Sequence, residues 1–142
     1  MIKSEYKYSD LTEKIIGCCM KVHNKLGNGP QEVIYQRALA IEMDRVNLSF
    51  ARELEMPIFY DEVGIGTRRV DFLVEEKVLV ELKAITKPEN VHLAKALNYV
   101  EAFKLEIGLL INFGNTKLEF KLRTVDPNRI KKMRELAVNA AK

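Results

Sequence analysis

The chain has 142 residues, of which 47% are hydrophobic and 30% are charged, and its formal net charge is +3. This composition predicts one globular domain over residues 1–142. It excludes a bilayer-spanning segment, because no apolar run approaches the roughly 18 residues that a span requires. The first ten residues lack the apolar core of a signal peptide, so we expect a cytoplasmic protein. The small positive charge permits nucleic-acid binding without requiring it.

The first predicted element is a helix that begins near Asp10 and ends at Gly27. Asp10 and Glu13 have the spacing of a capping box, which satisfies free backbone N–H groups of a first turn. Glycine is the residue that most often follows the end of a helix. Between these ends, apolar residues recur on one face, namely Ile15, Cys19, Val22 and Leu26.

A second helix is predicted over residues 31–46, after a loop at 27–30. Pro30 suits its first turn, where proline's missing N–H costs nothing. Asn47 is a suitable stop at its C-terminal end. The face predicted to lie inward carries Ile34, Ala38, Ile41 and Arg45.

Three strands are predicted next. Residues 48–60 form the first, and Pro57 within it indicates an edge strand or a bend. Residues 61–67 are predicted as a turn. The stretches RRVDFLVEE and KVLVELKA then read as two strands joined by a tight turn at 75–77, because both are rich in β-branched residues.

The last third of the chain is predicted as helix, strand, strand, helix. Thr86 and Glu89 have capping-box spacing, so we expect a helix to about residue 104. The nearly all-apolar run at 107–114 is typical of a strand buried on both faces. A further strand follows at 118–123, and Asp126 opens the last helix. The order α-α-β-β-β-α-β-β-α predicts a mixed β-sheet flanked by helices, of the α/β or α+β class.

The predicted hairpin carries charges within its apolar runs. Glu81 and Lys83 are two residues apart and therefore share a face of one strand. A turn at 75–77 would set Asp71 roughly opposite Glu81, and two such carboxylates repel unless a cation lies between them. A divalent ion beside Lys83 fits this spacing and could hydrolyse a phosphodiester bond. A solvent-exposed sheet face explains the same alternation, so both interpretations stay open here.

Several stretches, in this order and spacing, resemble a known family. Asp71 to Lys83 form D-x9-E-L-K, and GNGPQEVIYQRAL contains Gly29-x-x-Glu32-x-x-Tyr35. The chain continues with VDFLVEEKVLVELKA and HLAKALNYVEAFKLEIGLLINFG. Together these stretches resemble the GxxExxY branch of the PD-(D/E)xK nuclease superfamily over residues 10–123. The resemblance implies a restriction-endonuclease-like core.

The resemblance also implies a role for each position of the hairpin motif. Asp71 and Glu81 would be catalytic metal ligands, and the backbone carbonyl of Leu82 would be a further ligand. Lys83 would be the catalytic lysine. The residue before Asp71 is Val70 and not the proline of the superfamily's name.

Two helical positions complete the implied site. Glu32 would finish or orient the metal site, although a glutamate in a first helical turn is also explained by the helix dipole. Tyr35 would support Glu32 or contact substrate. On the later helix, Lys95 stands where many branches have a glutamine, and Tyr99 lies one turn further on. Both are candidates for substrate binding, and a lysine over a half-buried ring explains them equally well.

The function implied by the resemblance is a nuclease that uses Mg²⁺ or Mn²⁺ to hydrolyse phosphodiester bonds of DNA, in repair or in processing of foreign DNA. The alternative is an inactive module on the same fold that binds nucleic acid or a protein partner. A homodimer is compatible with either.

Overall fold

The computed structural model describes residues 8–86 and 106–125, which form two helices and five strands. The helices predicted over 86–104 and after Asp126 lie outside the described residues. Within those residues, no helix is long and apolar enough to cross a membrane. The elements are α1 (Ser9–Leu26), α2 (Glu32–Arg45), β1 (Phe50–Tyr60), β2 (Val63–Val74), β3 (Val78–Lys83), β4 (Glu106–Asn112) and β5 (Glu119–Val125). The predicted mixed α+β class is confirmed.

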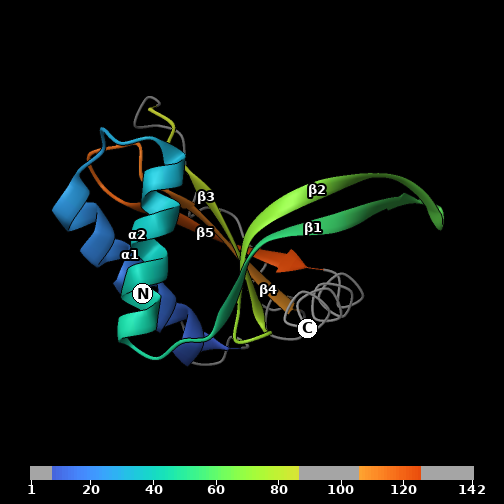
Figure 1. Cartoon of the computed structure of the whole chain (residues 1–142), viewed down its shortest axis with the longest axis horizontal. Coiled ribbons are helices and arrows are strands. Elements are labelled where there is room, and N and C mark those ends of the chain that lie inside the picture. The colour runs from blue at the N-terminus through green and yellow to red at the C-terminus, as the bar shows by residue number, and fades with distance from the viewer. Residues whose placement is uncertain (1–7, 87–105, 126–142) are drawn as a thin grey trace.

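The five strands form one sheet in the order β1-β2-β3-β4-β5. Neighbouring strands are antiparallel except β3 and β4, which run parallel. Parallel neighbours require a crossover connection, which the chain makes between Lys83 and Glu106. In Figure 1, α1 and α2 lie together on one side of the molecule, and the β1–β2 ribbon extends away from them.

The core lies between the two helices and the sheet. Tyr35, Leu39 and Met43 of α2 are fully buried, as are Ile15 and Cys19 of α1. They form one cluster with the sheet residues Phe72, Val74, Val78, Val80, Leu82, Ile107, Leu109, Ile111 and Phe113. The predicted inward positions Ile15, Cys19 and Val22 are therefore confirmed, whereas Leu26 is 38% exposed.

The ends of α1 differ in how well the sequence predicts them. The capping box was wrong: the N-cap is Tyr8 in a left-handed conformation, no side chain caps the helix, and Asp10 lies inside the first turn. The Thr12 hydroxyl and N–H both donate to the Tyr8 carbonyl, at 2.9 Å each. The predicted stop is confirmed, because Gly27 has φ 69° and donates its N–H to the His23 carbonyl at 2.8 Å.

The inward face of α2 is not the predicted one. Ile34 and Ile41 are 40% and 53% exposed, while the stripe that includes Tyr35, Leu39 and Met43 faces the core. Pro30 precedes the N-cap residue Gln31 instead of occupying the first turn. The helix ends at Arg45, and Asn47 follows with φ 61°, close to the predicted stop.

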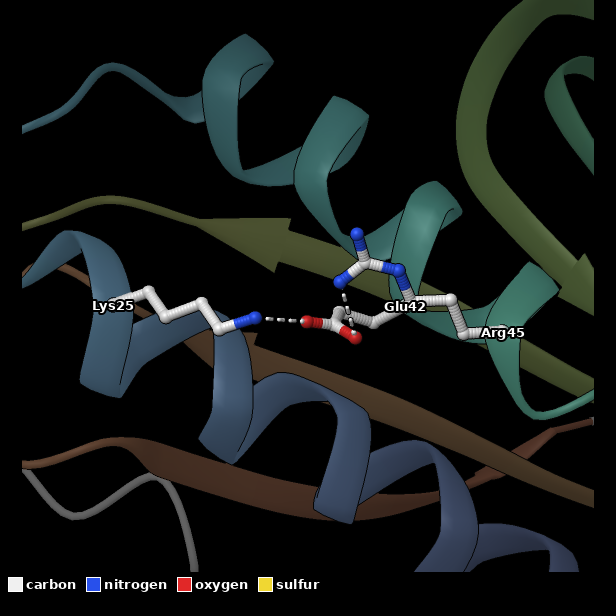
Figure 2. A network of polar contacts seen from close by, with 3 residues as sticks. All are labelled: Lys25, Glu42 and Arg45. Carbon is white, nitrogen blue, oxygen red and sulfur yellow. Dashed lines mark hydrogen bonds and ion pairs between the residues drawn. The ribbon is translucent and has the colours of Figure 1, made fainter.

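A charged cluster lies at the last turn of α2. Figure 2 shows Glu42 between Lys25 of α1 and Arg45 of α2, with nitrogen–oxygen distances of 3.1 and 3.4 Å. The hydrogen bond from Lys25, more than any other cause, lowers the pKa of the Glu42 carboxyl. The ion pair between Lys25 and Glu42 joins the two helices. Lys25 and Arg45 both contact the carboxylate of Glu42, and Glu42 itself is buried.

The β1–β2 ribbon is longer than predicted. Tyr60 pairs with Val63, so the predicted turn over 61–67 is reduced to Asp61 and Glu62. Both turn residues have positive φ, 48° and 72°, as in the type I′ turns that match strand twist. Pro57 lies on β1, which is an edge strand as its proline indicated.

Asn112 fastens the ends of β3 and β4 to each other. It is 3% exposed, and its amide accepts from the N–H groups of Ile85 and Gly114 at 2.9 and 3.1 Å. It also donates to the Ile85 carbonyl and to Glu119 Oε1, both at 2.9 Å. The chain approaches so closely here that a Cβ on Gly114 would lie 2.4 Å from the Ile85 nitrogen.

Candidate active site

The hairpin formed by β2 and β3 sets the register of the candidate site. Val74 pairs with Val78 and Phe72 with Val80, around a turn in which Glu75 and Glu76 have positive φ. This confirms the tight turn predicted at 75–77. Continued by one residue, the register sets Asp71 across from Glu81, so the two carboxylates do not lie on opposite faces.

Asp71 is unpaired on both sides of β2, because the ladder with β3 ends before it and the ladder with β1 skips it and then continues in the same register. The pairing with β3 ends at Phe72, and the pairing with β1 omits Glu53, whose φ is 54°. The Asp71 side chain occupies the position of the lost ladder bond, because its Oδ2 accepts from the Leu82 N–H at 2.8 Å. Its Oδ1 accepts from Gln36 Nε2 on α2 at 3.0 Å. The carboxylate is therefore held between the edge of β3 and helix α2.

Glu32, the first residue of α2, is electrostatically coupled to the hairpin. Partial desolvation raises the pKa of Glu32, and the negative charge of Asp71 raises it further. Lys83 opposes this shift, and Glu81 adds to it. The pKa of Glu32 thus responds to all three hairpin charges. A carboxyl group whose pKa is raised by neighbouring carboxylates is typical of sites that accept a cation.

The motif residues of β3 alternate as predicted. Glu81 is half-buried and Lys83 is exposed, while Leu82 between them is 1% exposed. The N–H and carbonyl of a strand residue point to the same strand edge. Because the Leu82 N–H meets Asp71, its carbonyl lies on that edge too, as its predicted role as a ligand requires.

The substrate contact of Tyr35 stays a prediction, and the structure favours the other role predicted for this residue, support of Glu32. The Tyr35 side chain is fully buried, so it presents no surface to a ligand. The ring stacks on Phe113 with centroids 4.5 Å apart, and the hydroxyl donates to the Gly27 carbonyl at 2.5 Å. Burial raises the pKa of this hydroxyl, which keeps it a donor. Tyr35 ties α2 to the end of α1 and so positions the helix that carries Glu32.

Lys95 and Tyr99, the other predicted substrate-binding residues, lie outside the described residues. One contributor to the site was not predicted at all. Gln36 is 6% exposed and bonds Asp71 directly. Its position four residues after Glu32 is the signal that could have found it, because residues i and i+4 share a helix face.

The donor chemistry of the site fits a hard divalent cation, because carboxylate and carbonyl oxygens are the ligands that Mg²⁺ and Mn²⁺ prefer. The side-chain positions are not yet those of a coordination sphere. In the parts of the chain that the structure describes, no three histidine, cysteine, aspartate or glutamate side chains are close enough to hold a metal ion.

Comparison with known proteins agrees with this geometry. No curated protein and no solved structure matches the chain significantly. The family model described as the PD-(D/E)XK nuclease superfamily matches residues 9–125, a range that contains Glu32 and the whole hairpin. The described part of this range has the mixed sheet and helices expected of such a fold. The chain belongs to the PD-(D/E)XK nuclease superfamily.

Proposed function

We propose that the chain is a divalent-metal-dependent nuclease of the GxxExxY type that hydrolyses phosphodiester bonds of DNA. The observation that carries this proposal is the position of the Asp71 carboxylate, which accepts from the Leu82 N–H at 2.8 Å and so lies beside the strand that carries Glu81 and Lys83. The charges of these three residues also act on Glu32 of α2, within a chain of the nuclease superfamily. Members of that superfamily generally use divalent metals and bind nucleic acid.

Asp71, Glu81 and the Leu82 carbonyl would hold Mg²⁺ or Mn²⁺, and Glu32 would complete or orient the ligand set. When bound, the ion supplies an activated water and positive charge for the phosphate. Lys83 is exposed at the end of β3 and carries a charge that reaches the site. Its ammonium would orient the attacking water or stabilise the charge that develops on the phosphate oxygens.

DNA as the substrate and a role in repair or in processing of foreign DNA follow from the sequence resemblance, as do Lys95 and Tyr99 as substrate-binding residues. Action in the cytoplasm and assembly as a homodimer are further parts of the proposal.

A DNA-binding or partner-binding module without turnover is the second candidate. It is favoured by Lys95, which stands where many branches of the superfamily have a glutamine. It predicts that the protein binds DNA and Mn²⁺ but leaves every substrate intact.

Cleavage of labelled single-stranded, duplex and branched DNA, with Mg²⁺, Mn²⁺ or EDTA, separates these candidates. Lys83→Ala and Glu81→Gln should each lower the rate by about 10²-fold or more if they act in the transition state. Lys117→Ala, at an exposed lysine in the loop after β4, is the matched control. Metal-dependent cutting that survives in both site variants would refute the assignment of the site, and DNA binding without cutting would select the second candidate.

A further inference from the structure

A chain of four groups runs from β1 through α2 to the hairpin. The Arg52 guanidinium on β1 donates to Gln36 Oε1 at 3.0 Å. Gln36 Nε2 on α2 donates to Asp71 Oδ1 at 3.0 Å, and the Leu82 N–H donates to Asp71 Oδ2 at 2.8 Å. Three different elements therefore determine where the Asp71 carboxylate lies.

The donor and acceptor chemistry allows this chain to run in one direction only. An arginine side chain donates and never accepts, and an ionised carboxylate accepts and never donates. The Gln36 amide must therefore turn its oxygen toward Arg52 and its nitrogen toward Asp71. The opposite amide orientation would face donor to donor and acceptor to acceptor, and both hydrogen bonds would be lost. Arg52 thus fixes which end of Gln36 Asp71 meets.

Because Gln36 is buried, water cannot easily replace its hydrogen-bond partners. Gln36 is 6% exposed and packs at the core side of α2, next to the fully buried Tyr35. Arg52 lies over the Phe72 ring, with its guanidinium carbon 5.8 Å from the ring centroid, which restrains an otherwise exposed side chain. A buried amide that loses a partner keeps the full cost of its desolvation.

Gln36 also links two members of the proposed site. It lies four residues after Glu32 on the same helix, so one rigid segment carries Glu32 and bonds Asp71. A change at Gln36 would alter the position of Asp71 relative to Glu32 without removing either carboxylate.

We propose that Gln36, oriented by Arg52, is a positioning residue that holds the Asp71 carboxylate in place for the divalent ion. The part of this inference that concerns the divalent ion rests on the proposed nuclease function. The part that concerns the position of the Asp71 carboxylate rests on hydrogen-bond geometry alone. Residues that orient a metal ligand through a hydrogen bond typically change metal affinity about 10- to 100-fold when replaced.

The test uses the full chain with Gln36→Met, Arg52→Met, the double variant and Arg37→Met. Methionine matches the length of the glutamine side chain, is shorter than the arginine side chain, and cannot form these hydrogen bonds. Arg37 is the exposed neighbour of Gln36 on α2, so Arg37→Met controls for loss of a nearby arginine. Three quantities are measured: the Mn²⁺ dissociation constant by titration calorimetry without DNA, the NMR shift of the Leu82 amide proton, and urea unfolding.

Gln36→Met should weaken Mn²⁺ binding about ten-fold or more and move the Leu82 amide resonance. Arg52→Met should produce smaller changes in the same direction, and the double variant should resemble Gln36→Met alone, because both act on one chain of contacts. Arg37→Met should change neither quantity. A purely structural amide would lower the free energy of unfolding and leave the Mn²⁺ affinity of the folded protein unchanged, which would overturn the inference.

The outcomes also distinguish this inference from the proposed function. If the unaltered protein neither binds Mn²⁺ nor cuts DNA, the nuclease proposal fails, and the Leu82 resonance alone decides whether Gln36 positions Asp71. An unmoved resonance in Gln36→Met overturns the positioning role whatever the metal does. If Gln36→Met does not fold, the exposed Arg52→Met variant gives the same comparison.

Discussion

Replacing Tyr35 with phenylalanine separates a packing role of the motif tyrosine from a chemical one. Tyr35→Phe keeps a fully buried ring stacked on Phe113 and removes only the hydroxyl that donates to the Gly27 carbonyl. Loss of one such hydrogen bond should cost about 0.5–1.5 kcal/mol. In a domain of this size, 1 kcal/mol corresponds to about 3–5 °C in Tm. Tyr35→Ala also removes the ring and should cost about 3–5 kcal/mol.

The assay is urea unfolding followed by far-UV circular dichroism, with DNA cleavage measured on the folded variants. We expect Tyr35→Phe to be modestly destabilised and to cleave DNA at the unaltered rate, because a buried hydroxyl cannot reach substrate. A Tyr35→Phe protein that keeps its full stability but loses cleavage would refute this reasoning and would indicate that the Tyr35 hydroxyl takes part in the reaction.

Three further predictions concern backbone contact, helix propensity and pH. Gly114→Ala should cost about 1–3 kcal/mol or more in urea unfolding, because its Cβ would lie 2.4 Å from the Ile85 nitrogen. Gly17→Ala, in the middle of α1 with nothing within 4 Å, should instead stabilise by about 0.5–1 kcal/mol. The Ser49 hydroxyl, more than the Ser49 N–H, holds the pKa of Glu75 below its ordinary value, so Glu75→Gln should lower stability at pH 7. That difference should close as the pH falls through the lowered pKa, and a difference that stays constant with pH would contradict it.

Local sequence patterns were sufficient for most element positions and insufficient for one helix face. The strands predicted at 107–114 and 118–123 appear as β4 and β5, because continuous apolar runs favour buried strands. On α2, the stripe with Ile34 and Ile41 and the stripe with Tyr35 and Leu39 have the same helical period. Period alone cannot choose between them. Tertiary packing determines which stripe lies inward, and in the structure it is the stripe whose Tyr35 ring stacks on Phe113.

The candidate site was likewise only partly predictable from the sequence. A tight turn fixes the register of a hairpin, so the sequence was sufficient to place Asp71 and Glu81 on one face of it, and their close approach stays a prediction. Gln36 reaches Asp71 from α2, and Arg52 of β1 contacts Gln36. The spacing from Glu32 places Gln36 on the right helix face, but no local rule brings Arg52 or Asp71 to it. The roles of Lys95 and Tyr99 stay predictions, as do those of the metal ligands.

The buried amide of Asn112 has a consequence for how the sheet avoids misalignment. β4 is so uniformly apolar that sliding it by two residues along β3 would keep the same side chains inward and lose little hydrophobic contact. The amide would then leave the N–H and the carbonyl of Ile85, and each abandoned polar partner would carry a desolvation penalty. A single asparagine therefore selects between strand alignments that have nearly equal hydrophobic stabilisation. It lies at the strand end where Lys83 must be placed.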